Sequence, residues 1–117
     1  MDAEIVKKRT RAFGLRVLRL VEALPKTPAG KVIGAQLLKS GTAIGANYRA
    51  ACRARSRAEF VVKMGVVEEE ADETVYWIEM LVDAGLVPQQ RVAELPDEAN
   101  QIVAIVVSSI KTARRKR

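Results

Sequence analysis

Residues 36–48 read QLLKSGTAIGANY, a stretch of small and apolar side chains broken by single polar ones. Residues from this stretch and its flanks share one face at helical spacing, in alternating steps of four and three: Ile33, Leu37, Ser40, Ile44, Asn47 and Ala51. Ser40 and Asn47 are polar and lie one heptad apart. A polar residue in an apolar seam costs stability but fixes register and partner choice. The stretch therefore predicts helices that pack in one particular arrangement.

Three glycines, Gly34, Gly41 and Gly45, lie inside the same predicted helix. Each costs up to about 1 kcal/mol relative to alanine in a helix interior. One interpretation is a kink or break near Ser40; the other is close approach of a second helix backbone. Further small residues continue the surface at Ala43, Ala46 and Ala50. We therefore favour close packing.

Helix signals bracket the two segments at the start of the chain. The first segment, about 3–24, has an apolar stripe at helix period and ends before Pro25. Thr27 is placed to cap the second segment, about 28–54, with Pro28 at its first position.

The later segments carry signals of the same kind. The third begins after Ser56, which forms a capping-box pattern with Glu59, and ends near Gly85. Pro88 can open a short helix, and Pro96 either kinks it or starts a new one. Short connections make neighbouring helices antiparallel. We predict an all-α, up-down-up-down four-helix bundle in one domain, residues 1–117, with a basic C-terminal tail from about 111.

The composition is that of a folded domain, with 49% hydrophobic and 29% charged residues but only 4% aromatic ones. No apolar run is long enough to cross a membrane, and no apolar leader is visible at the N-terminus. The single cysteine, Cys52, cannot form an intrachain disulfide. These features predict a cytoplasmic protein with no membrane association.

The net charge of +6 is unevenly distributed. Basic residues gather in the first segment, around the second turn and in the tail, whereas acidic residues concentrate at 68–73. Such an excess suggests an anionic partner, with nucleic acid the first choice and a membrane surface the second. The alternative is that the charges serve solubility and salt bridges between subunits. The candidate nucleic-acid-binding residues are Arg49, Arg53, Arg55, Arg57, Lys111, Arg114, Arg115, Lys116 and Arg117.

Catalytic chemistry has little support. The chain contains no histidine, which removes the commonest general base and metal ligand. Glu69 and Glu70 each share a helix face with Glu73, so a carboxylate metal site is conceivable, but a charged face that meets basic residues is favoured. We predict no enzyme activity, no cofactor and no metal.

The polar seam residues suggest a role in assembly instead. If the second and third segments pack antiparallel, Asn47 faces the third, and we hypothesise that its amide bonds the carboxylate of Glu70 or Glu73. Trp77 is expected in the core or an interface. The predicted helix-packing and oligomer residues are Ser40, Gly41, Asn47, Glu70, Glu73 and Trp77.

Three motifs resemble the bacterial four-helix bundle protein family, which includes proteins encoded in intervening sequences of 23S ribosomal RNA genes. They are QLLxSGTAIGANYxA at 36–50, EFxxK at 59–63 and EAxETxYW at 70–77, and the closing SSIKTAR at 108–114 also fits. One departure is Arg49, near which many members carry an acidic residue.

The resemblance implies an antiparallel bundle that assembles into a ring-like homopentamer. A relative, the accessory variability protein of diversity-generating retroelements, is a basic pentamer that binds nucleic acid and a reverse transcriptase. Two functions follow as expectations. The first is a homo-oligomeric scaffold that binds structured RNA or an RNA–DNA hybrid through its basic surface, mostly without regard to sequence. The second is a structural or protein-interaction module, for example one that assists a reverse transcriptase.

Overall fold

Four long helices and one short helix make up the structure, a computed structural model that describes residues 2–115. They are α1 (Ala3–Glu22), α2 (Pro28–Cys52), α3 (Arg57–Asp83), the short α4 (Gln89–Val92) and α5 (Glu94–Arg115). The described residues include no strand, so the prediction of an all-α protein is confirmed, and four long helices are compatible with the predicted bundle.

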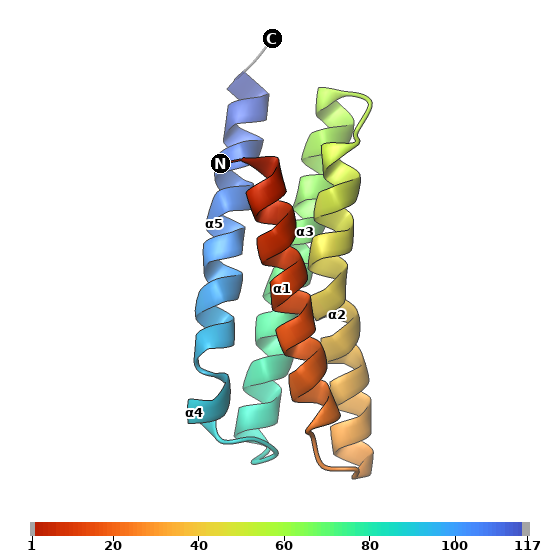
Figure 1. Ribbon diagram of the computed structural model, residues 1–117, viewed down its shortest axis with the longest axis vertical. Helices are drawn as coiled ribbons and strands as arrows, with labels where there is room; N and C mark the ends of the chain where they lie inside the picture. Colours follow the sequence, from red (N-terminus) through yellow and green to blue (C-terminus); the bar gives the residue numbers. More distant parts are fainter. Residues whose placement is uncertain (1, 116–117) are drawn as a thin grey trace.

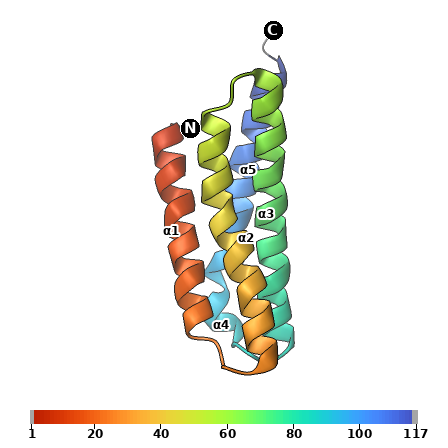
Figure 2. The same cartoon turned by 90° about the vertical axis from the view of Figure 1, so that its right-hand side faces the viewer.

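The long helices lie side by side in a body of 51 × 22 × 20 Å (Figure 1). The start of α1, the α2–α3 turn and the end of α5 lie at the same end of this body (Figure 1). Turned by 90°, the view shows α1 and α3 on either side of α2, with α5 behind (Figure 2). α2 packs on both α1 and α3, and α5 packs mainly on α3, whereas α1 and α5 meet more sparsely.

The predicted helix boundaries are formed by the expected caps. Thr27 Oγ1 accepts a hydrogen bond from the Gly30 N–H at 3.1 Å, which satisfies one of the free amides of the first turn of α2. Ser56 Oγ accepts one from the Glu59 N–H at 3.0 Å and caps α3 in the same way. Gly85 follows α3 with a φ of +73°, a backbone conformation that glycine adopts without steric cost.

Pro96 starts a helix and does not break one. α4 ends at Val92, and α5 begins two residues later at Glu94, which places Pro96 in its first turn. The amides of a first helical turn have no partner within the helix, so the missing N–H of proline costs nothing there. Of the two alternatives for this proline, the structure selects the new helix.

Close packing explains the three interior glycines of α2, a helix that runs unbroken from residue 28 to 52. A Cβ atom on Gly41 would lie 2.7 Å from Val17 Cγ1, closer than real Cβ contacts allow. A Cβ on Gly34 would lie 3.2 Å from Leu24 Cδ1, and one on Gly45 would lie 3.4 Å from a side-chain oxygen of α1. The glycines therefore let α1 approach α2, and the alternative of a break near residue 40 is excluded.

Ser40 and Asn47 find different partners in the seam. Ser40 is 1% exposed and hydrogen-bonds the hydroxyl of Thr74 on α3. Asn47 Nδ2 donates instead to the carbonyl oxygen of Ala43, within its own helix, at 2.9 Å. The predicted bond from Asn47 to Glu70 or Glu73 is therefore not formed within the described chain.

The register of the two helices accounts for this difference. With Ser40 opposite Thr74, a step of two turns toward the end of α2 corresponds to two turns back along α3. Asn47 is therefore level with Val67, which is buried and apolar. The carboxylates that were expected to bind it lie about one turn or more away. A local bond to its own helix is what remains for the amide.

Candidate nucleic-acid interface

Three basic groups from distant parts of the sequence lie at one end of the bundle. The first half of α1, the last turns of α2 and the last turns of α5 all reach the end that holds the α2–α3 turn (Figure 1). The packing of the helices brings them together, since none is close to another in sequence. The exposed basic residues of this end are Lys8, Arg11, Arg49, Arg53, Arg55, Arg57, Lys111, Arg114 and Arg115.

A trough of about 760 Å³ runs between α1 and α2 at this end. We call it the α1–α2 trough. Its cations come from both helices, and Gly14 and Gly45, which have no side chains, line it between them. The walls carry Lys7, Lys8 and Arg11 from α1 and Arg49 and Arg53 from α2.

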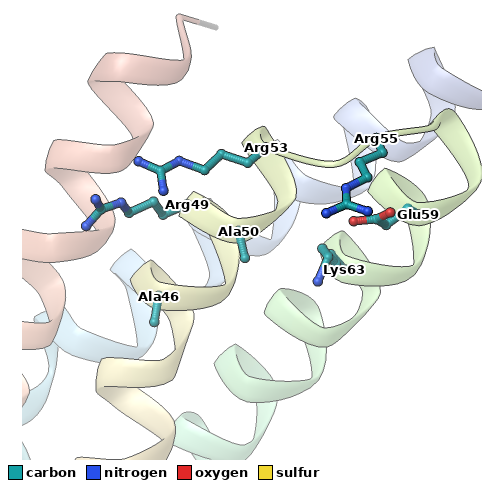
Figure 3. Close-up of a pocket in the computed structure, with 7 residues that line it drawn as sticks. All are labelled: Ala46, Arg49, Ala50, Arg53, Arg55, Glu59 and Lys63. Carbon is teal, nitrogen blue, oxygen red and sulfur yellow. The ribbon is translucent and has the colours of Figure 1, made fainter.

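A second trough, of about 500 Å³, lies on the other side of α2, toward α3. We call it the α2–α3 trough. Its floor is formed by the small side chains of Ala46 and Ala50. On the α3 side it is lined by Arg55 and Lys63 together with the acidic Glu59 (Figure 3). The acid reduces the positive charge of this wall but leaves cations in excess.

Arg49 and Arg53 line both troughs and form the wall between them. They are four residues apart and so lie on the same face of α2. Figure 3 shows both side chains extending from α2 toward α1. Their position at the C-terminal end of α2 also places positive charge next to the negative end of the helix dipole, which favours the helix.

The cations of the wall are not used in ion pairs with described residues. The ion pairs found within residues 2–115 join Lys7 to Glu4 at 3.0 Å, Arg9 to Glu98 at 2.6 Å and Arg16 to Glu94 at 3.3 Å. Arg49 and Arg53 belong to none of them. Their guanidinium groups can therefore bind phosphate without first breaking a salt bridge in the described chain.

Arg9 has a different task from its basic neighbours on α1. Its guanidinium donates two hydrogen bonds to the Glu98 carboxylate, from Nε at 2.6 Å and Nη2 at 2.8 Å, and so ties α1 to α5. These bonds lower the pKa of Glu98, and their effect outweighs that of burial, which raises it. Arg9 is thus a structural residue and is not available to a ligand.

The predicted nucleic-acid residues fall into three sets. Arg49, Arg53 and Arg55 line the troughs, whereas Arg57 is exposed but lines neither. The tail residues Lys111, Arg114 and Arg115 lie at the same end on α5, away from the troughs. Lys116 and Arg117 lie outside the described residues.

Sequence reasoning did not select four trough residues: Lys7, Lys8, Arg11 and Lys63. No local signal marks these residues, because charge counting along the chain cannot show which helices lie together. The packing of α1 on α2 places Thr10 and Arg11 beside Gly45, so the first half of α1 reaches the last turns of α2. The packing of α3 on α2 brings Lys63 to the α2–α3 trough.

The residues assigned to oligomer contacts divide between the interior and the surface. Ser40 and Gly41 are buried between helices of the same chain. Trp77 is half-buried on α3, where its Nε1–H donates to Glu73 Oε1 at 3.2 Å and its ring meets Tyr76 edge-on. Burial and the neighbouring acids raise the pKa of Glu70.

Neither a metal-ion site nor a membrane-spanning helix is found in residues 2–115. No group of three or more cysteine, aspartate or glutamate side chains there is placed to hold a metal ion. None of the described helices has the length and apolar character needed to span a bilayer.

Comparison with known proteins identifies relatives across nearly the whole length. Residues 2–108 match the family described as 23S rRNA-intervening sequence protein. A crystal structure from Bacteroides thetaiotaomicron, described as a protein with unknown function from the S23 ribosomal protein family, superposes with a TM-score of 0.85. The two chains are 34% identical, and the match covers 91% of this chain and 98% of the other. No curated protein matches the chain.

Proposed function

This chain belongs to the 23S rRNA-intervening sequence protein family, and we propose that it is a non-enzymatic helical scaffold that binds nucleic acid through the basic end of its bundle. The observation that carries the proposal is the gathering of three separate basic groups at that end, with two cation-lined troughs among them. Phosphate groups are the natural partners of such a surface.

The surface favours contact with the backbone over reading of bases. Ala46 and Ala50, which form the floor beside the arginine wall, have no groups that can hydrogen-bond base edges. The chain has few aromatic residues, so base stacking on aromatic platforms contributes little. Binding should therefore depend on the charge and shape of the nucleic acid, and structured RNA and RNA–DNA hybrids are the substrates we propose.

Assembly is a second part of the proposal. We infer an antiparallel up-down-up-down subunit that forms a ring-like homo-oligomer, a pentamer if it follows the family resemblance. A ring would repeat the basic end in each subunit and bind one long polyanion at several points, which raises avidity without new contacts. Sedimentation equilibrium gives the stoichiometry directly, and a monomer at micromolar concentration would contradict this part.

A salt series tests the binding proposal. Protein is titrated into fluorescently labelled structured RNA and duplex DNA, and anisotropy is recorded from about 50 to 200 mM salt. We expect log K to fall linearly with log salt, with a slope that reports the number of phosphate contacts. Absence of binding at the lowest salt concentration would show the proposal to be wrong.

The tail has its own variant in the same assay. Reversal of Lys111, Arg114 and Arg115 to glutamate should weaken binding and flatten the salt dependence, because three cations leave the basic end. Unchanged binding would remove the described part of the tail from the interface. The troughs would then carry the interaction alone.

A protein-interaction module is the second candidate, and the outer face of α3 favours it. Val62 and Tyr76 are 67% and 52% exposed on this helix, close to the acidic residues 68–73. Acidic residues beside exposed apolar ones suit a basic partner surface, such as another subunit or a reverse transcriptase. If this candidate is correct, added salt should dissociate the oligomer, and no complex with nucleic acid should be detected at any salt concentration.

A further inference from the structure

We propose that the basic end recognises double-helical nucleic acid by seating one strand backbone in each trough, with the wall of Arg49 and Arg53 in the groove between the strands. This inference rests on the proposed function and adds the class of substrate. It follows from three features of the two troughs: what they share, how far apart they lie and which charges stand on their outer sides.

The shared wall is the first feature. Arg49, Arg53 and Ala46 line both troughs, so the troughs run side by side and are separated only by the exposed side chains of α2. A single strand can occupy one trough or the other. Two strands that run together, as in a double helix, can occupy both at once, and both then contact the same arginine pair.

The separation of the troughs is the second feature. They lie on opposite flanks of one α-helix, whose diameter with side chains is about 10–12 Å. The two backbones that border the major groove of B-form DNA are about 12 Å apart, whereas the major groove of A-form RNA is narrow, so the separation favours duplex DNA among double-helical substrates. The troughs are thus separated by about one helix width, which is the scale of the distance between the two backbones across that groove.

The outer charges are the third feature. Beyond the α1–α2 trough stand Lys8 and Arg11, both exposed, and beyond the α2–α3 trough stand Arg55 and Lys63. Each backbone would therefore lie between the central wall and an outer pair of cations. A surface made for one strand needs only one such outer pair.

Small side chains beside the arginine wall fit this arrangement. Ala46 is exposed and lines both troughs, and Ala50 is half-exposed in the α2–α3 trough. Larger residues at these positions would hold the groove edges away from the arginine wall. Phosphate contacts from the arginine wall and from the outer cations would supply affinity without a sequence preference.

Paired variants separate the two strands. Lys8→Ala/Arg11→Ala removes the outer cations of one trough, and Arg55→Ala/Lys63→Ala removes those of the other. Lys26→Ala/Lys31→Ala, a pair at the opposite end of the bundle, is the matched control with the same change in net charge. Each full-length variant is titrated into a labelled DNA 20-mer as single strand and as duplex, and circular dichroism checks the helix content of the variant. Glutamine versions replace any pair that lowers it.

We expect each outer pair to weaken duplex binding about tenfold and to reduce the salt slope by about two. At most one of the two pairs should weaken binding of the single strand, because that strand fills one trough. The control pair should change neither. Equal losses for single strand and duplex in both outer variants, or a duplex loss in only one, would overturn the inference while the proposed function stood. Loss of all binding in the unmodified protein would instead refute the proposed function.

Discussion

The hydroxyl oxygens of Ser40 and Thr74 lie 3.0 Å apart in a hydrogen bond that joins α2 to α3 inside an apolar seam. The residues are 1% and 0% exposed. Each hydroxyl also lies near a carbonyl oxygen of its own helix, at 3.3 Å from Leu37 and 2.7 Å from Glu70. Because every polar atom of the pair has a partner, the seam tolerates it, and only one register of the two helices preserves the bond.

The Ser40–Thr74 pair should show coupling in unfolding experiments. Thr74→Val leaves Ser40 without its cross-helix partner and should lower the free energy of unfolding by about 1 kcal/mol. Ser40→Ala with Thr74→Val removes both hydroxyls from an apolar site and should be nearly neutral. Urea unfolding of the two single variants and the double variant measures the coupling. Additive losses would show that the hydroxyls do not support each other.

Gly41 should be intolerant of a methyl group. Gly41→Ala places a Cβ 2.7 Å from Val17 Cγ1, so α1 must shift, and the free energy of unfolding should fall by about 1–3 kcal/mol. Gly65→Ala is the control on α3, since a Cβ there meets nothing within 4 Å, and it should stabilise the helix by about 0.5–1 kcal/mol. Val17→Ala should restore part of the loss in Gly41→Ala. Equal effects at the two glycines would contradict the close approach of α1 and α2.

The Arg9–Glu98 pair should stabilise the fold only while the carboxylate is ionised. The folded state lowers the pKa of Glu98, so its contribution is present above the unfolded value of about 4.3 and is lost as pH falls through the folded value. Glu98→Gln should cost about 1–2 kcal/mol at pH 7 and little at pH 2. Glu94→Gln, whose side chain is 88% exposed, is the control and should cost almost nothing. Chemical unfolding at the two pH values tests this prediction. A loss of stability in Glu98→Gln that persists at pH 2 would show that the charge of Glu98 is not its cause.

Glu70 should behave in the opposite sense. Its pKa is raised in the folded state, chiefly by burial and then by Glu73, so folding is disfavoured once pH exceeds the unfolded value of about 4.3. Glu70→Gln should therefore raise the thermal midpoint at pH 7, which corresponds to a gain of less than about 1 kcal/mol in the free energy of unfolding. This gain should disappear below pH 4. Glu79→Gln removes the same charge from an exposed position of α3 and serves as the control. A pH-independent gain would indicate a packing effect instead.

Local signals in the sequence were sufficient for the elements. Thr27, Ser56 and Gly85 mark helix ends because capping depends on a side chain and on amides a few residues away. The packing role of the α2 glycines could also be predicted, since several residues that destabilise a helix, placed among alanines, indicate close approach of another helix. Pro96 could not be decided locally, because its effect depends on whether the preceding turn is already helical.

Only part of the candidate site could be predicted from local signals in the sequence. Arg49, Arg53 and Arg55 cluster in sequence and were identified by charge alone. Lys8 and Lys63 belong to other helices and join them only through the register of the bundle. The partner of Asn47 was predicted wrongly for the same reason. A shift of about one turn along α3 places the buried Val67 opposite Asn47 in place of a carboxylate.

The helices, their caps and the polar residues of the seam could be predicted from the amino-acid sequence, since each depends on interactions within a few residues or on a period of 3.6. The pairing of Thr74 with Ser40 and the position of Arg49 and Arg53 between two troughs became known only from the packed helices. These relations depend on how far one helix slides along another, and that offset is set by the packing of many side chains together, such as Val17 against Gly41.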